Sequence, residues 1–579
     1  MEEKKLTGYP SIDKPWLKLY NKKAIEAPLP ECTIYEYLRA KNTDNMNRSA
    51  IRYYGASITY TQMFDKVDAV AASLSTMGVS LGSVVTIAMF NQPEAIYLLL
   101  ALNKIGAIAN FVFGGAPQAE LKHQLLSTNS HVVFSLDLFT ESFLSIAKET
   151  SLKKLISVPI TQSMSAISRL AVSVSGKIEK INIRKSSLVM KWKEFLCVNR
   201  KTSSEIQSAN DPNAVAFITY TGGTTGGSKG VMLTNKATLA VAEQYMRGEP
   251  ELHRSSIWMQ IIPFFTAYGI TCSLIIPLAV GMTLIVRLPL ADSLLQLCKK
   301  FKPNHIVSGP AVWESFAEAN VNLDLSYLIA PISGGDMLRE SAEEKINAYL
   351  ERCGCQYKLM NGYGMTEVGA AVACNFKDKY EFGSVGAPFV KNVIAAFDIA
   401  TGNELPYYKE GEICICAPSM MIGYVAQTSE TNNIMRRHND GNIWIHSGDL
   451  GYVSPAGFIH ISGRLKRYTL SYKNGVAKKI FSLDIEKILL QHEIVLDCAV
   501  VPAADEEKVY APVAYIVPKE DSWSTAQMNA ELVAWSNVHL DELYRPKRYY
   551  FIKEFPRTKL GKVDYMALER MATKEEQNG

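Results

Sequence analysis

Apolar and polar positions alternate along most of the chain in two rhythms. Apolar residues recur at helical spacing over 64–77 and 93–102, which predicts helices there. Short continuous apolar runs at 83–89 and 107–113 predict buried strands. A third run, 214–218, predicts a buried strand that ends just before a glycine-rich loop. Helices and buried strands that alternate in this way favour layered α/β structure with a largely parallel sheet.

The part of the chain after Gly463 has a different pattern, which is typical of a compact α+β unit. Its length of roughly a hundred residues is a common domain size. We therefore predict a large N-terminal domain of layered α/β subdomains over 1–465 and a small α+β C-terminal domain over 466–579. The elements expected in the small domain are a helix, two strands and a second helix, over 483–491, 499–502, 511–517 and 526–538.

Composition and charge agree with a multi-domain cytoplasmic protein. The 579 residues are 47% hydrophobic, which is enough to bury a sizeable core. A net charge of +4 does not indicate a nucleic-acid partner. No apolar run follows the charged start of the chain, so we expect no signal peptide. The ten cysteines lack zinc-binding spacing, which favours reduced thiols in the cytoplasm.

The longest nearly uncharged stretch, 270–286, is interrupted by Pro277 and Gly281. It is too short to cross a bilayer comfortably. We expect a core helix, a turn and a strand instead.

The most informative stretch for chemistry is 219–230, which reads T-Y-T-G-G-T-T-G-G-S-K-G. Its glycines, hydroxyls and single lysine supply the N–H groups, side-chain donors and positive charge of a phosphate-binding loop. The common P-loop has Lys directly after its second glycine and Ser or Thr directly after the lysine. Here Ser228 intervenes and Gly230 follows Lys229, which excludes a GTPase-like loop. A flexible linker is disfavoured because the loop lies between two apolar segments.

Residues 220–231 resemble the nucleotide loop of the adenylate-forming superfamily, which includes acyl-CoA synthetases, aryl-CoA ligases, peptide-synthetase adenylation domains and beetle luciferases. The resemblance covers about residues 30–570, because further motifs follow in that superfamily's order. They are S-G-G-D at 333–336, N-G-Y-G-M-T-E at 361–367, G-S-V-G-A-P at 383–388, G-E-I at 411–413, G-Y at 423–424, S-G-D-L-G at 447–451, G-R-L-K at 463–466 and P-R-T-K-L-G-K-V at 556–563.

The resemblance implies ATP-dependent adenylation of a fatty or aryl-type carboxylic acid, with release of pyrophosphate. It also implies transfer of the acyl group to the thiol of coenzyme A, with Mg²⁺ as the metal. In such enzymes the small domain is mobile and rotates about a hinge, here Lys466, between the two half-reactions. Three alternatives stay open: loading of a carrier protein, a luciferase-like oxygenase, and a non-catalytic nucleotide-binding relative. Retention of the motifs' charged residues disfavours the last.

Adenylation brings two anions together, so it requires positive charge and oriented donors around both. By resemblance, Lys229 and Lys562 supply the positive charge, Thr366 contacts the α-phosphate, and Glu367 holds Mg²⁺ through oxygen. The nucleotide-binding residues implied by the resemblance are Thr221, Gly222, Gly223, Thr224, Thr225, Gly226, Ser333, Gly334, Gly335, Asn361, Gly362, Tyr363, Gly364, Asp449 and Arg464.

The acyl-binding pocket implied by the resemblance is formed by Phe265, Thr266, Tyr268 and Gly269. This part of the sequence departs from the family pattern, because many acyl- and aryl-CoA ligases have His where Thr266 stands. The other departures are Ser228 for a common Pro, Asn235 for a frequent His, Arg467 for a usual acid, and a loop at 468–477 that is about two residues longer.

A basic segment, 151–201, contains eleven Lys and Arg residues but only two acidic ones, Glu179 and Glu194. A basic amphipathic helix in this segment suits a membrane surface. An ordinary surface helix with a solvated basic face is the favoured interpretation, and peripheral membrane contact stays open. The helical face in question carries Ile167, Leu170, Val174, Ile178 and Ile181, with Lys177, Lys180 and Arg184 off it.

Overall fold

The computed structural model divides into two compact units. The first comprises 1–395, 414–446 and 453–460, and the second comprises 396–413, 447–452 and 461–579. The residues described are 6–175, 183–184, 186–198, 208–221, 228–249, 251–287, 294–319, 321–465, 468–473, 476–504, 510–519, 523–557 and 563–577.

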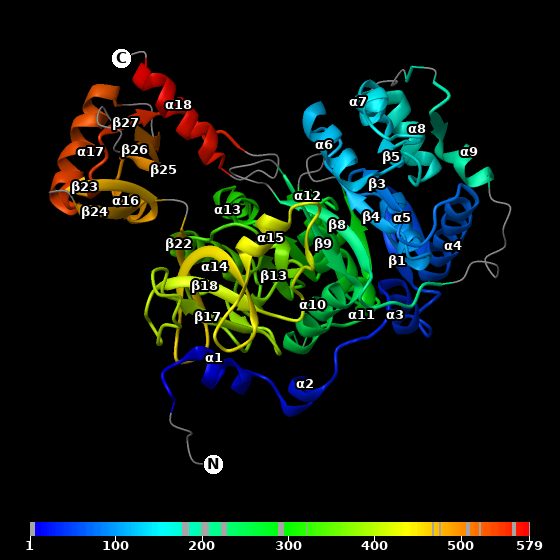
Figure 1. Ribbon diagram of the computed structural model, residues 1–579, viewed down its shortest axis with the longest axis horizontal. Helices are drawn as coiled ribbons and strands as arrows, with labels where there is room; N and C mark the ends of the chain where they lie inside the picture. The colour runs from blue at the N-terminus through cyan, green and yellow to red at the C-terminus, as the bar shows by residue number, and fades with distance from the viewer. Residues whose placement is uncertain are drawn as a thin grey trace. The chain divides into compact units, whose positions relative to one another are not determined.

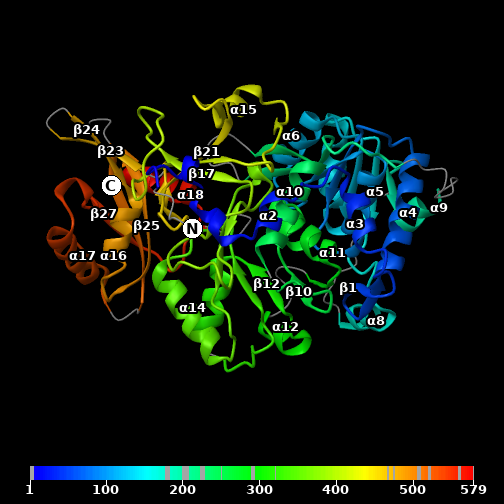
Figure 2. The same ribbon diagram turned by 90° about the horizontal axis from the view of Figure 1, so that it is seen from below.

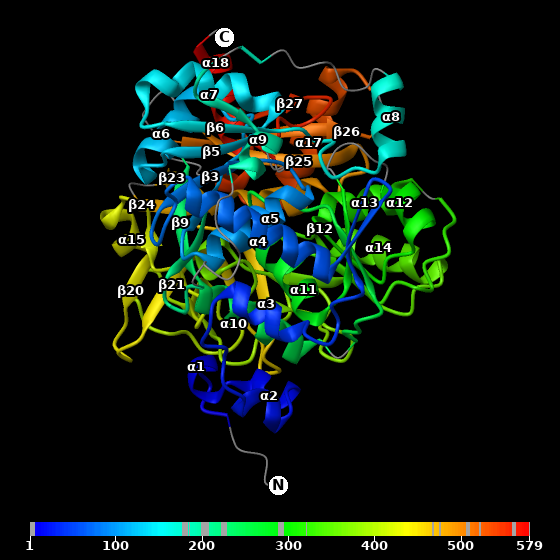
Figure 3. The ribbon, with the colours of Figure 1, turned by 90° about the vertical axis from the view of Figure 1, so that its right-hand side faces the viewer.

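The first unit contains an eight-stranded sheet in the order β19-β9-β8-β4-β3-β5-β6-β7. Strands β3 to β8 pair in parallel, whereas β9 pairs antiparallel with both β8 and β19. Figure 3 shows β3, β5 and β6 side by side. The strands are β3 (Val84–Ala88), β4 (Ile108–Phe111), β5 (Val132–Leu136), β6 (Lys154–Val158), β7 (Val189–Lys191), β8 (Val215–Thr221), β9 (Lys229–Thr234) and β19 (Gly423–Tyr424).

A second sheet of nine strands has the order β16-β15-β14-β13-β12-β10-β11-β1-β2. Its central strands, from β14 to β1, pair in parallel. Figure 2 shows β12 beside β10, with β1 further along. The strands are β1 (Ser49–Tyr53), β2 (Ala56–Thr59), β10 (Ile257–Gln260), β11 (Thr283–Val286), β12 (His305–Ser308), β13 (Ala330–Ser333), β14 (Met360–Tyr363), β15 (Ala373–Cys374) and β16 (Ala387–Pro388).

Helices of the first unit bury their apolar faces between and against these sheets (Figure 1). All twelve residues of α5 (Pro93–Lys104) are buried, because α3 (Ile34–Lys41), α4 (Tyr60–Thr76) and strands β3 and β4 cover it. Its middle, 95–102, carries no charged residue, as is expected of a helix that is covered in this way. The helices predicted over 64–77 and 93–102 are therefore present as α4 and α5, whose boundaries differ from the prediction by a few residues.

The uncharged stretch folds as a helix, a turn and a strand. It begins with a π-helix, η5 (Tyr268–Ile275), which continues as α11 (Ile276–Val280). Gly281 then adopts a φ of 90°, a conformation that favours glycine, and β11 follows. The sequence predicted this order but not the π geometry of the first turns. Among the described residues, no helix combines the length and apolar character needed to cross a membrane.

The second unit is an α+β structure built around the three-stranded sheet β25-β26-β27. Both helices and both strands predicted from the sequence are present. The elements are β23 (Tyr468–Lys473), β24 (Val476–Phe481), α16 (Ser482–Leu489), β25 (Val495–Ala504), β26 (Tyr510–Pro518), α17 (Thr525–His539), β27 (Arg548–Phe551) and α18 (Tyr565–Gln577).

Five further strands form one sheet, and the division between the two units passes through four of them. The fold class, a large α/β unit with a smaller α+β unit, is confirmed. The boundary at 465/466 stays a prediction. The strands are β17 (Val393–Phe397), β18 (Gly411–Cys416), β20 (Met435–Arg437), β21 (Ile443–Val453) and β22 (Ile459–Arg464), and all except β20 are divided.

Candidate active site

Most of the predicted site residues lie within the described part of the chain. Those outside it are Gly222, Gly223, Thr224, Thr225, Gly226, Lys466 and Lys562, together with Arg467, Lys177 and Lys180.

Two of the predicted motifs lie at the carboxyl ends of neighbouring parallel strands. Ser333 ends β13 and pairs in register with Asn361 of β14. In open α/β sheets this edge is where ligands bind. Asn361 is buried and its side-chain amide donates to the main-chain oxygen of Ser384 (3.3 Å), which fixes the start of the second motif.

Glycines in these motifs leave space for close contacts. A Cβ on Gly334 would lie 3.0 Å from the Tyr268 hydroxyl, which reaches this edge from η5. A Cβ on Gly364 would lie 1.7 Å from the main-chain oxygen of Ala370, so no larger residue fits there. Gly335 adopts a φ of 84°, which also favours glycine.

Two buried hydroxyls at this edge have no hydrogen-bond partner within the described part of the chain: Ser333 Oγ and Tyr268 Oη. Burial raises the pKa of Tyr268 well above its usual range, so its hydroxyl stays protonated and able to donate. Leaving a buried hydroxyl unpaired is costly, and both groups therefore suit a polar ligand.

Glu367, the predicted metal ligand, lies in the short helix η6 (Thr366–Val368) and is 6% exposed. The Tyr424 hydroxyl donates to Glu367 Oε1 (2.6 Å), and the Met421 N–H donates to the main-chain oxygen of Glu367 (2.8 Å). Burial, together with the Glu367 carboxylate, raises the pKa of Tyr424 far above its usual range. The neutral tyrosine therefore remains a donor to Glu367.

Lys229, the predicted loop lysine, begins β9 and lies directly opposite Thr221 at the end of β8. These two residues hold the ends of the glycine-rich loop together. The Lys229 ammonium forms an ion pair with Glu430 of α15 (Thr428–Ile434) and lies 5.2 Å from the centre of the Tyr424 ring. Tyr424 therefore contacts both the predicted phosphate-binding lysine and the predicted metal ligand.

No role for Tyr424 or Glu430 was predicted from the sequence. Tyr424 belongs to the G-Y motif at 423–424, but nothing in the motif reveals where its hydroxyl points. Glu430 carries no sequence signal, because its partner Lys229 is 201 residues away.

Asp449 and Arg464, two of the predicted nucleotide-binding residues, lie in the second unit and contact each other. Arg464 Nε lies 2.8 Å from Asp449 Oδ1. Asp449 is 4% exposed, whereas the Arg464 side chain is 62% exposed. Gly448 adopts a φ of 72°, and its N–H donates to Glu412 Oε1 (3.1 Å), which fixes the turn before Asp449.

The predicted acyl-pocket residues form two kinds of contact. Thr266 Oγ1 donates to the main-chain oxygen of Pro263 (2.8 Å) and accepts from the Gly269 N–H (3.0 Å), so it caps the start of η5. A hydroxyl can play this capping role where relatives have His. The Phe265 ring packs against Phe113, with ring centres 5.2 Å apart.

Phe113 joins Phe265 to two more rings, which creates a four-ring aromatic cluster. Phe90 and Phe139 lie 6.3 and 6.2 Å from Phe113, measured between ring centres. Phe90 and Phe113 are only partly buried, so part of this apolar surface is accessible. We define the aromatic cluster as Phe90, Phe113, Phe139 and Phe265.

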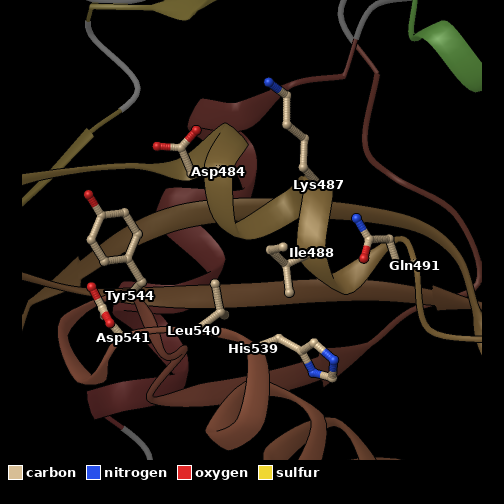
Figure 4. A pocket seen from close by; sticks show the side chains of 8 residues that line it. All are labelled: Asp484, Lys487, Ile488, Gln491, His539, Leu540, Asp541 and Tyr544. Carbon is tan, nitrogen blue, oxygen red and sulfur yellow. The ribbon is translucent and has the colours of Figure 1, made fainter.

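A separate pocket of about 510 Å³ lies in the second unit (Figure 4). Burial raises the pKa of Asp484 on its rim. None of the predicted site residues in the described part of the chain lines this pocket. Its lining residues are Asp484, Lys487, Ile488, Gln491, His539, Leu540, Asp541 and Tyr544.

Comparison with known proteins assigns the chain to a family. Residues 38–425 match the AMP-binding enzyme family, and residues 484–562 match the AMP-binding enzyme C-terminal domain. The chain belongs to the AMP-binding enzymes. The resemblance to the adenylate-forming superfamily is therefore confirmed.

Named AMP-binding enzymes align with almost the whole chain. A long-chain-fatty-acid–CoA ligase of Bacillus subtilis is 26% identical over 559 residues, 95% of this chain and 96% of the relative. A 4-coumarate–CoA ligase of Humulus lupulus is 27% identical and covers 88% of both chains. The crystal structure of an anthranilate CoA ligase in complex with anthranoyl-AMP has the same fold, with a TM-score of 0.79, 20% identity, and coverage of 96% of this chain and 100% of that one.

The donor set suits the ligands expected of an AMP-binding enzyme. Glu367 offers a buried carboxylate, and hard cations such as Mg²⁺ prefer oxygen ligands. The hydroxyls of Ser333 and Tyr268, which have no partner among the described residues, offer hydrogen bonds at the edge where the nucleotide motif lies.

Proposed function

We propose that this protein is an AMP-forming acid–thiol ligase. It uses ATP to adenylate a carboxylic acid, releases pyrophosphate, and passes the acyl group to the thiol of coenzyme A. One observation carries the proposal: Tyr424 contacts both Lys229 and Glu367. The proposed phosphate-binding lysine and the proposed metal-binding carboxylate therefore lie close together, in a chain that belongs to the AMP-binding enzymes.

In this proposal the charged residues lower the cost of bringing two anions together. Lys229 and Lys562 compensate the negative charge of the triphosphate and of the attacking carboxylate. Mg²⁺, when bound by Glu367, neutralises phosphate charge and orients the oxygens. Thr366 donates to the α-phosphate.

The other motif residues position the nucleoside. Asp449 accepts hydrogen bonds from the ribose diol, because a carboxylate can accept two at once, and Arg464 adds a positive charge. Tyr363 packs against one face of adenine, with Ser333, Gly334 and Gly335 on the other. Asn361, Gly362 and Gly364 shape the turn that carries Tyr363.

Coenzyme A is the proposed acceptor because both aligned relatives are named CoA ligases. The proposed acid is apolar or aromatic, because Phe265, one of the proposed pocket residues, belongs to the aromatic cluster and packs against Phe113. The test is pyrophosphate release across fatty, aryl, bile and amino acids, with and without coenzyme A. Thioester that forms only on a carrier protein would contradict the assigned acceptor.

Two further features belong to the proposal. Residues 466–579 form a mobile C-terminal domain that rotates about Lys466 between the half-reactions, as in the superfamily that the motifs resemble.

The second feature is peripheral membrane contact through 151–201, supported by α8 (Ala166–Ser175), which has no buried residue. Ile167, Leu170 and Val174 lie on one face and are 82%, 67% and 80% exposed. Three large aliphatic side chains facing solvent on a basic segment suit an anionic membrane surface. Ile178 and Ile181, which the sequence places on the same face, lie outside the described residues.

A further inference from the structure

One short segment, 421–431, contacts both Glu367, the proposed metal ligand, and Lys229, the proposed phosphate-binding lysine. It contacts Glu367 through the Met421 N–H and the Tyr424 hydroxyl. It contacts Lys229 through the Tyr424 ring and the Glu430 carboxylate. The segment is anchored to β9, because β19 pairs with that strand and the Val425 N–H donates to the main-chain oxygen of Gly230 (2.8 Å).

Thr431 fixes Tyr424 and Glu430 relative to each other. The Tyr424 N–H donates to Thr431 Oγ1 (2.9 Å), which in turn donates to the main-chain oxygen of Gln427 (3.0 Å). A Cβ on Gly423 would lie 3.1 Å from Thr431 Cγ2, and Gly423 has a φ of 146°. This close packing keeps α15 against β19, so Glu430 is held facing Lys229.

In this structure the Lys229 ammonium is paired with the Glu430 carboxylate. Its proposed function requires that the same ammonium bind phosphate instead. The side chains of Lys229 and Glu430 are 25% and 45% exposed, so solvent and ligands can reach the ion pair. Ion pairs this exposed are weak. A polyphosphate carries more charge than a carboxylate and competes for the same ammonium donors. Glu430 would also repel that polyphosphate if it stayed beside Lys229.

We propose that Glu430 is a positioning residue that pairs with Lys229 in the nucleotide-free protein and yields it to the β- and γ-phosphates of ATP. The inference rests on the proposed phosphate-binding role of Lys229. The Lys229 ammonium lies beside the Tyr424 ring, and the proposed exchange replaces only its anionic partner. Nucleotide binding then includes the cost of breaking the ion pair, which lowers affinity for ligands that carry β- and γ-phosphates.

The test is Glu430→Gln, with nucleotide binding measured by equilibrium dialysis in the presence of Mg²⁺ and without a carboxylic acid. We expect the affinity for ATP to rise about two- to five-fold, because the broken ion pair is a weak one. The affinity for AMP should stay the same, because AMP lacks the two phosphates in question. Glu31→Gln is the matched control, since Glu31 pairs with Lys236 (2.7 Å) in the same unit, and we expect no change in either affinity.

Lys229→Met separates this inference from the proposed function. It should weaken ATP binding tenfold or more, and Glu430→Gln should have no further effect in that background. Unchanged ATP binding in Lys229→Met would show that Lys229 does not bind phosphate, and both ideas would fall. If Lys229→Met weakens binding but Glu430→Gln fails to strengthen it, or affects ATP and AMP equally, the exchange alone is wrong.

Discussion

Tyr424 shows how much of a charged site can depend on one neutral side chain. Its hydroxyl satisfies one oxygen of a buried carboxylate, and its ring faces a lysine ammonium. A carboxylate that is 6% exposed needs such donors, because its charge is poorly solvated. The tyrosine therefore holds the Glu367 carboxylate in a fixed orientation.

Tyr424→Phe should raise the Mg²⁺ concentration needed for activity. The substitution keeps the ring but leaves Glu367 Oε1 without its donor, at a cost of about 1–3 kcal/mol. We expect ATP–pyrophosphate exchange to fall roughly tenfold at limiting Mg²⁺ and less at saturating Mg²⁺. The melting temperature serves as the control for folding. An unaltered Mg²⁺ dependence would mean that the hydroxyl does not position Glu367.

Glu94, at the start of α5, gives a prediction for pH. Burial raises its pKa to about 7, although a hydrogen bond from Ser163 Oγ to Glu94 Oε1 (2.5 Å) opposes the shift. Because the folded state holds this proton more tightly than the unfolded chain, its contribution to stability is full below about pH 4.5 and is lost as pH rises to about 7. The loss is about 3 kcal/mol.

Glu94→Gln should remove most of this dependence. Urea unfolding measures the free energy of unfolding at pH 5 and at pH 7.5. The difference between these two free energies should be smaller in the variant than in the wild type. An identical difference in the variant and the wild type would place the ionisation elsewhere.

Contacts between distant residues are what the sequence could not predict. Phosphate chemistry and a metal-binding carboxylate followed from motifs, because each motif is local. The hydrogen bond between Tyr424 and Glu367 spans 57 residues, and the ion pair between Lys229 and Glu430 spans 201. Such pairs depend on the packing of β9, β19 and α15, and one sequence does not reveal that packing.

At the scale of elements, the pattern of apolar residues predicted the buried strands of the eight-stranded sheet. The run 83–89 became β3 (Val84–Ala88), and 107–113 became β4 (Ile108–Phe111), because buried parallel strands are almost wholly apolar. The π-helix η5 was not foreseen, since an apolar stretch has the same composition whichever helical geometry it adopts. The Thr266 hydroxyl forms two hydrogen bonds at the start of this helix.

Helix α8 gives a prediction at this scale. The triple substitution Ile167→Ser, Leu170→Ser and Val174→Ser removes its exposed apolar face, so it should reduce binding to vesicles that contain anionic lipid. Each residue is more than half exposed, so the fold should tolerate the change. Co-sedimentation at low salt measures the effect, and Ser173→Ala on the same helix is the control. If the wild-type protein ignores such vesicles, α8 is an ordinary surface helix.

At the scale of the whole molecule, the proposed domain rotation predicts that the two half-reactions can be separated. Lys562→Ala should abolish acyl-AMP formation but still convert supplied acyl-AMP and coenzyme A to thioester. Lys466→Pro should do the reverse, because proline fixes φ near −65° and restricts the hinge after the first step. Both half-reactions are assayed separately in both variants. Equal loss of both steps in Lys562→Ala would remove the support for rotation.

The second unit is not a continuous piece of chain, since 396–413 and 447–452 belong to it together with 461–579. Recombination at residue 465 would therefore transfer only part of a folding unit. A chimaera that took 466–579 from another family member would combine that foreign sequence with the native segments 396–413 and 447–452 in one unit. A sequence exchange that tests the proposed acyl pocket is therefore simpler within the first unit, where η5 and the aromatic cluster lie, than at residue 465.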